Sequence, residues 1–92
     1  MITRTASARY EGFRKDRKGH VSTQSGVLDE QAYGFGSRFE SEKGTNPEEL
    51  IAAAHAACFT MALSFALARE GLTDGTLATE AKVKLDKDGD GF

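Results

Sequence analysis

The sequence is poor in cysteine and proline and carries no strong excess of either charge. Its 92 residues include one cysteine, Cys58, and one proline, Pro47. A single cysteine excludes an intrachain disulfide and any metal site built from several cysteines, and it is typical of a reducing compartment. A formal net charge of −2 gives no electrostatic footprint for nucleic acid or for an anionic membrane. The N-terminus has no apolar run of signal-peptide length, so we expect a cytoplasmic protein that binds neither nucleic acid nor membranes.

The dominant feature is the stretch 46–71, which predicts one long helix with an apolar run from Leu50 to Ala68. Asn46 suits the N-cap, Pro47 the first helical position and Gly71 the residue after the end. The run is apolar on nearly all sides, so we expect it to be buried on nearly all sides. It is long enough to cross a bilayer, but its many alanines, its histidine and its lack of a flanking basic cluster favour a core helix. The alanines permit another backbone to approach closely, and a second copy of this helix in a homodimer is one candidate.

Alternating residue patterns predict β-strands at 3–10, 19–25, 32–40 and 77–85. In 32–40 the aromatic side chains share one face, which should cover a core. The other face is nearly bare backbone at Gly34 and Gly36, beside Arg38. Glycines in a strand often mark the close approach of a ligand or another backbone, so we expect this arginine to be positioned to meet an anion.

These elements predict an α+β fold in a single domain over residues 1–92, with an N-terminal antiparallel sheet, a long central helix and a further strand. The final strand precedes a turn, and such a turn calls for a partner strand. One helix also leaves much apolar surface uncovered. We therefore expect the chain to be an incomplete part of the fold, completed by further sequence or by a dimer partner. The turn, DKDGDG at 86–91, matches the start of an EF-hand loop, but the preceding strand period favours an ordinary hairpin turn over calcium binding.

Two interpretations of Cys58 stay open on spacing alone: a small buried hydrophobe, or a reactive thiol. A reactive thiol requires a nearby cation, for which Arg38 is suitable. His55 lies about 60° away around the helix, so a Cys/His pair is conceivable, although an interior histidine is more often structural. Glu48 suits a bidentate pair with the arginine, but a simple charge at the helix N-terminus explains it equally well. Glu48 and Cys58 are about 15 Å apart along one helix, so a composite site across a two-fold interface would bring them together.

The blocks NPEEL and AAHAACF resemble the OsmC/Ohr family, named for osmotically inducible protein C and organic hydroperoxide resistance protein, and they are most similar to the OsmC branch. The resemblance implies a cytoplasmic homodimer with two central helices against β-sheets. It also implies reduction of organic hydroperoxides, and more weakly of hydrogen peroxide, by a cysteine without a metal, haem or flavin cofactor. By position it makes Cys58 the peroxidatic cysteine and carries the arginine and glutamate roles to Arg38 and Glu48. The family's resolving cysteine lies in a later part that this chain lacks.

The mechanism implied by the resemblance begins with Arg38 stabilising a thiolate while Glu48 orients Arg38. The thiolate attacks the peroxide and Cys58 becomes a sulfenic acid, which a dithiol such as a lipoylated protein finally reduces. A pocket favouring bulky peroxides could be shaped by apolar side chains that core packing alone would also explain, namely Phe35, Phe59, Met61 and Phe65. The alternative function is a non-catalytic dimeric module in which Cys58 only fills the core, or a fragment without turnover.

Overall fold

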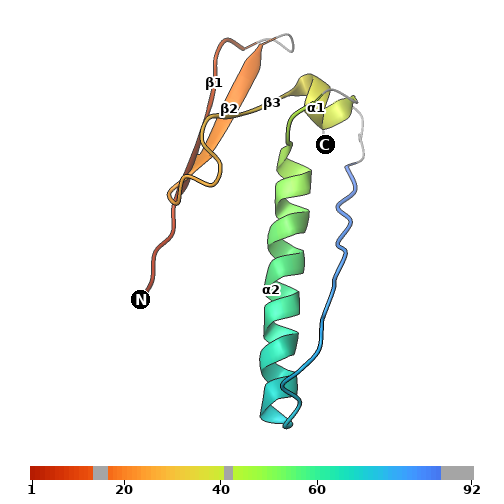
Figure 1. The fold of residues 1–92 in the computed structure, drawn as a ribbon. Helices are drawn as coiled ribbons and strands as arrows, with labels where there is room; N and C mark the ends of the chain where they lie inside the picture. The colour runs from red at the N-terminus through yellow and green to blue at the C-terminus, as the bar shows by residue number, and fades with distance from the viewer. Residues whose placement is uncertain (14–16, 41–42, 86–92) are drawn as a thin grey trace. The chain divides into compact units, whose positions relative to one another are not determined.

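The computed structural model describes residues 1–13, 17–40 and 43–85. The chain divides into two compact units, Met1–Pro47 and Glu48–Phe92, and each is described by itself. The first unit holds the sheet and a short helix, and the second holds nearly all of the long helix and the segment that follows it (Figure 1). The α+β prediction is confirmed at this level, whereas the single domain over residues 1–92 stays a prediction.

The first unit is built on a three-stranded antiparallel sheet in the order β1-β2-β3. Its strands are β1 (Ala6–Tyr10), β2 (Lys18–Thr23) and β3 (Gln31–Gly34). They lie where the alternating patterns before the helix predict strands, although each is shorter than predicted.

Two tyrosines pack over a glycine at the centre of this sheet. Gly19 of β2 pairs with Tyr10 on one side and with Tyr33 on the other. A Cβ at Gly19 would lie 2.6 Å from the ring of Tyr33 and 2.8 Å from that of Tyr10. The two ring centroids are 6.2 Å apart, within the range for favourable aromatic pairs. The two rings can therefore pack over Gly19 because this residue has no side chain.

An exposed ion-pair network joins the first strand to the turn before β3. Arg9 pairs with Glu30 and, at 3.1 Å, with Glu11. Hydrogen bonding to these carboxylates raises the pKa of Arg9, and the same bond from Arg9 lowers the pKa of Glu30. Glu30 has a left-handed backbone with φ of 54°, and its N–H donates to the Ser22 hydroxyl at 2.9 Å. Side-chain and backbone bonds thus hold this residue in an uncommon conformation.

Residues 35–39 correct the prediction of a strand over 32–40. The strand ends at Gly34, and the chain continues as the short helix α1 (Phe35–Phe39). The Ser37 hydroxyl accepts the Gly34 N–H at 2.9 Å and donates to the Gly34 carbonyl at 3.2 Å, which closes the first turn. The rings of Phe35 and Phe39 lie 4.7 Å apart. A spacing of four residues puts two side chains on one face of a helix as well as of a strand, so the aromatic pattern did not distinguish them.

The long helix is confirmed as α2 (Pro47–Arg69). Its end is a Schellman arrangement, in which the N–H of Leu72 reaches the carbonyl of Leu67 at 3.0 Å and that of Gly71 reaches Ala68 at 3.0 Å. Gly71 has φ of +88°, a conformation that favours glycine. The glycine predicted to follow the helix therefore ends it.

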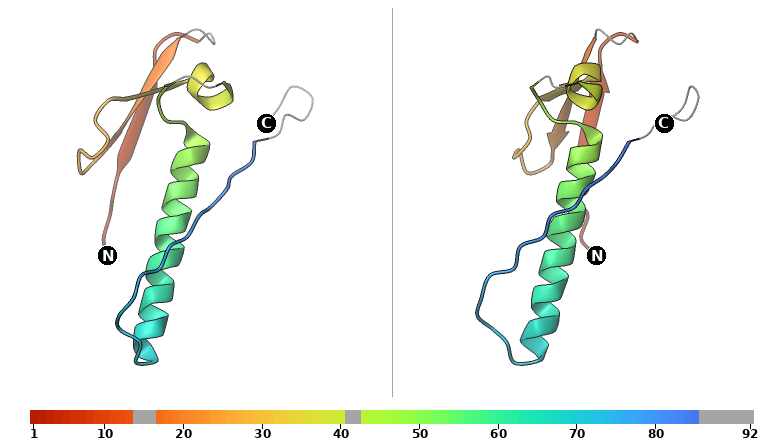
Figure 2. Two further views of the ribbon diagram at one scale, coloured as in Figure 1. Left: turned by 45° about the vertical axis from the view of Figure 1, so that its right-hand side comes forward. Right: turned by 90° about the vertical axis from the view of Figure 1, so that its right-hand side faces the viewer.

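After α2 the chain returns along the helix as an extended segment, as Figures 1 and 2 show for residues 72–85. The hydroxyls of Thr60 and Thr79 meet at 2.6 Å. The predicted strand at 77–85 is not borne out, because these residues join no sheet within the described part of the chain. One stripe of the helix is half-buried: Ala52, Ala56, Thr60, Ser64 and Leu67.

The rest of α2 differs from the expectation of burial on nearly all sides. No residue of this helix is buried, and among the residues that the structure describes none forms a buried hydrophobic core. By length and composition alone α2 could also cross a membrane. This is weak evidence, because core helices of soluble proteins pass the same test. The uncovered apolar faces are therefore the main feature of the second unit.

Candidate active site

Cys58 lies at the middle of α2 with an exposed free thiol. At 3.6 residues per turn it points away from the stripe centred on Thr60. Ile51 and Phe65 lie seven residues before and after it, nearly in line with it along the helix, and both are exposed. Within this chain Cys58 is therefore no buried hydrophobe but a thiol at the centre of an exposed apolar helix face.

Two further candidates from the sequence share this helix. Glu48 is half-buried in the first turn, and His55 is exposed. Seven residues separate them, so they lie nearly in line along the helix, and Cys58 is about 60° further around from His55. Cys58 remains about 15 Å from Glu48 along the axis. The helix thus brings His55 close to Cys58 but does not bring Glu48 there.

Arg38 lies on α1, not on the strand on which it was predicted. Its guanidinium carbon is 5.1 Å from the centroid of the Phe39 ring, a cation–π contact. The residue is exposed. Arg38 belongs to the first unit, whereas Glu48 and Cys58 belong to the second. The structure therefore defines the local surroundings of each residue, and a site that joins them is a proposal.

Two residues that the sequence did not single out as site residues hold the turn that carries Arg38. Ser37 is only 9% exposed, and its hydroxyl bonds to both polar backbone groups of Gly34. Its carbonyl accepts the Asn46 side-chain N–H at 3.0 Å, which satisfies an orphan carbonyl of the short helix. The signal for Ser37 in the sequence was a hydroxyl three residues after a glycine, which is capping spacing.

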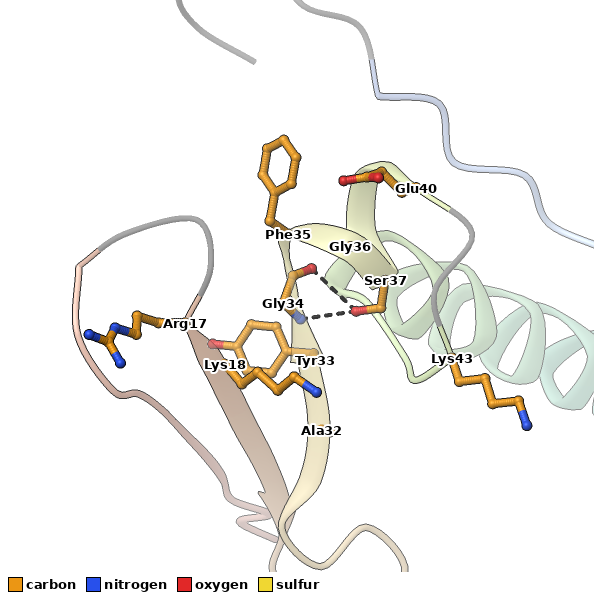
Figure 3. A pocket seen from close by; sticks show the side chains of 10 residues that line it. All are labelled: Arg17, Lys18, Ala32, Tyr33, Gly34, Phe35, Gly36, Ser37, Glu40 and Lys43. Atoms are coloured by element: carbon orange, nitrogen blue, oxygen red, sulfur yellow. Dashed lines mark hydrogen bonds between the residues drawn. The ribbon is translucent and has the colours of Figure 1, made fainter.

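A hollow of about 460 Å³ lies between β2, β3 and α1 in the first unit. The rings of Tyr33 and Phe35, the backbone of Gly34 and the side chain of Lys18 contribute to its lining (Figure 3). Phe35 lines this hollow, but the other side chains of the predicted substrate pocket, Phe59, Met61 and Phe65, lie on α2 in the second unit, so the substrate pocket stays a prediction. The Ser37 hydroxyl in this wall is turned to Gly34, as the dashed lines in Figure 3 show.

A metal centre has no visible basis in this part of the chain. Within residues 1–13, 17–40 and 43–85, no three His, Cys, Asp or Glu side chains are placed to hold a metal ion. The EF-hand-like turn at 86–91 lies outside the described residues.

Comparison with known proteins identifies the family. Residues 40–92 match the family described as OsmC-like protein. The chain is 58% identical over 91 residues to peroxiredoxin OsmC of Escherichia coli, a match that covers 99% of this chain and 64% of that protein. It is 40% identical over 75 residues to organic hydroperoxide resistance protein OhrB of Bacillus subtilis, covering 82% of this chain and 54% of the relative. A third relative, organic hydroperoxide resistance protein-like 1 of Staphylococcus saprophyticus, is 35% identical over 72 residues and is covered to 50%.

The chain spans between half and two-thirds of the length of these relatives. The family match covers more than half of the chain, and it includes all of α2 with Glu48 and Cys58. This agrees with the resemblance carried by the NPEEL and AAHAACF blocks. The chain belongs to the OsmC-like protein family.

Proposed function

We propose that the protein is a thiol-dependent peroxidase that reduces organic hydroperoxides, and hydrogen peroxide more weakly, in the defence against peroxide stress. Family membership supports this, as do the names of the relatives, which include a peroxiredoxin and organic hydroperoxide resistance proteins. The observation that carries the proposal is the exposed thiol of Cys58 on an apolar helix face. A peroxide can reach this sulfur, and its alkyl group finds apolar surface beside it.

The reaction at Cys58 is a two-electron transfer. The thiolate attacks the terminal oxygen of the hydroperoxide, an S–O bond forms, the O–O bond breaks, and the departing oxygen takes up a proton to leave as the alcohol. Cys58 becomes a sulfenic acid. Ile51 and Phe59 are exposed apolar neighbours on this helix, and contact with them favours bulky alkyl peroxides over hydrogen peroxide.

Arg38 and Glu48 act on the charge of the sulfur. A guanidinium beside Cys58 stabilises the thiolate, which is the nucleophilic form. Glu48 orients the guanidinium through a bidentate pair. Because about 15 Å of helix separates Glu48 from Cys58, we propose a composite site in which two copies of the chain each contribute part.

The same proposal gives α2 a partner. A homodimer in which a second copy of α2 packs at Phe65, about two turns beyond Cys58, would remove this ring from water and leave the sulfur open to the peroxide, and the alanines would let the backbones approach closely. A two-fold interface of this kind is self-complementary. The cytoplasm keeps the single cysteine reduced, and a dithiol such as a lipoylated protein restores the thiol from its oxidised form.

The experiment is to trap the sulfenic acid. The chain is treated with one equivalent of cumene hydroperoxide, and a sulfenic-acid probe is then located by mass spectrometry. We expect labelling at Cys58, little labelling in Arg38→Ala and none in Cys58→Ser. Arg4→Ala is the matched control, because this exposed arginine bonds to the carbonyl of the preceding residue and should label like the parent. Absence of labelling in the parent would favour the alternative, a non-catalytic dimeric module.

A further inference from the structure

We propose that His55 is a catalytic residue that protonates the departing alkoxide, an inference that rests on the proposed peroxidase function. When a thiolate takes the terminal oxygen of a hydroperoxide, the other oxygen leaves as a strongly basic alkoxide. A positioned acid that protonates this oxygen in the transition state typically accelerates such a step about 10²–10⁴-fold.

The helix places His55 within reach of this chemistry. His55 and Cys58 are three residues apart on α2, where Cβ atoms lie about 5–6 Å from each other. Helical side chains lean toward the N-terminus of their helix, so the sulfur of Cys58 leans toward the turn that carries His55. Both side chains are exposed, and both lie on the side of α2 away from the Thr60–Thr79 contact. A hydroperoxide on the sulfur therefore meets the imidazole.

Within about two turns of Cys58 the helix carries no ionisable side chain other than His55 that could donate this proton. From Leu50 to Ala68 the only ionisable side chains are those of His55 and Cys58. Imidazole is the side chain that gains and loses a proton near neutral pH. An ionisable group among alanines has no packing advantage there, since the exposed imidazole fills no core. Proton transfer to the substrate gives it a function.

The step balances without another reactant. His55 carries, as imidazolium, the proton that Cys58 releases on becoming a thiolate. The sulfur attacks the terminal oxygen and loses two electrons, and the O–O bond breaks with its electron pair on the departing oxygen. The imidazolium gives its proton to that oxygen. The products are the sulfenic acid on Cys58, the alcohol and neutral His55.

The test compares two oxidants with different leaving groups. Cumene hydroperoxide releases a basic alkoxide that needs a proton, whereas perbenzoic acid releases benzoate, which needs none. Single-turnover oxidation of Cys58 is followed at pH 7 for the parent chain and for His55→Gln. We expect the ratio of the two rate constants, cumene hydroperoxide to perbenzoic acid, to fall about 100-fold in the variant. Added imidazole should restore part of the cumene hydroperoxide rate.

Changes in folding or in thiolate content act on both oxidants alike and cancel in this ratio. An unchanged ratio in His55→Gln therefore overturns the proposal, whether both rates fall together or neither falls. Failure of the peroxidase function itself would look different, because the parent chain would then react with cumene hydroperoxide no faster than free cysteine does.

Discussion

Replacing Ser37 by alanine tests whether the turn that carries Arg38 is held by one hydroxyl. The Ser37 hydroxyl accepts the Gly34 N–H at 2.9 Å and donates to the Gly34 carbonyl at 3.2 Å. Ser37 is only 9% exposed, so water cannot easily take the place of the lost group. The substitution removes no apolar contact and leaves the helix-forming tendency of α1 intact or better.

The expected magnitude follows from the hydrogen bonds that are lost. A net hydrogen bond contributes about 1 kcal/mol, and a buried donor left without a partner costs about 1–3 kcal/mol. Loss of a hydroxyl cap typically costs about 1 kcal/mol. We therefore expect the local free energy of opening at Gly34 to fall by about 1.4 kcal/mol, which is a factor of about ten.

Amide hydrogen exchange measures this directly. The Gly34 N–H should exchange about ten times faster in Ser37→Ala than in the parent. Because α1 carries Arg38, the oxidation of Cys58 by cumene hydroperoxide should slow as well, though by less than in Arg38→Ala. Ser7→Ala is the control: this serine is exposed on β1, and its loss should change neither quantity.

Two results would contradict the roles given to the Ser37 hydroxyl and to Arg38. Unchanged exchange at Gly34 would mean that the hydroxyl does not hold the turn. Faster exchange with an unchanged oxidation rate would mean that the position of α1 does not matter to Cys58, and Arg38 would lose its proposed role.

Three further predictions concern stability and assembly. Gly44→Ala should lower the free energy of unfolding in urea by about 1 kcal/mol or more, because φ is +126° and a Cβ would lie 2.9 Å from a backbone oxygen; Gly26→Ala, with φ of +81° and open space, should cost less, and equal losses would contradict this. The hydrogen bond from Arg9 lowers the pKa of Glu30 from its ordinary value of 4.5. The ionised carboxylate therefore stabilises the fold at pH values above 4.5, and this stabilisation is lost as the pH falls through the lowered pKa of the folded state. Urea unfolding should show Glu30→Gln less stable than the parent at pH 7, with a gap that closes in acid and does not widen. Phe65 is 58% exposed, and covering about 100 Å² of its ring is worth up to about 2.5 kcal/mol. Phe65→Ala should therefore raise the dimer dissociation constant in sedimentation equilibrium by up to about 60-fold for each of the two copies, and an unchanged constant would exclude this face as the interface.

The parts of the fold that the sequence predicts are those with local signals. Pro47 and Gly71 mark the two ends of α2 by their own backbone restrictions, and the structure places the helix between them. The hairpin of β1 and β2 follows from alternation on either side of a polar turn. These features need no knowledge of distant contacts.

The missed parts depend on contacts that a pattern does not contain. Phe35 and Phe39 fit one face of a strand and one face of a helix equally, and the Ser37 hydroxyl decides for the helix by closing its first turn. Residues 77–85 alternate well, but a strand exists only where a neighbour pairs with it, and the described part of the chain supplies none. The prediction that α2 is buried on nearly all sides was wrong for the same reason, since the sequence shows an apolar face but not what covers it.

The candidate site divides in the same way. Spacing alone did not decide whether Cys58 is a core residue or a reactive thiol. It placed Glu48 about 15 Å from Cys58 along the helix. The roles of Arg38, Glu48 and Cys58 came from resemblance to the family, which the comparisons confirm. The roles themselves stay predictions, because they depend on how the two units lie relative to each other and on the proposed second copy of the chain.

The most direct test of whether Cys58 is activated is the second-order rate constant for its oxidation by cumene hydroperoxide at pH 7, measured by stopped flow beside free cysteine. We predict that the chain reacts orders of magnitude faster than free cysteine, and that Arg38→Lys, which keeps the charge but not the fork of donors, loses most of this advantage. A rate equal to that of free cysteine, or one indifferent to Arg38, would contradict the claim that this thiol is activated for peroxide reduction.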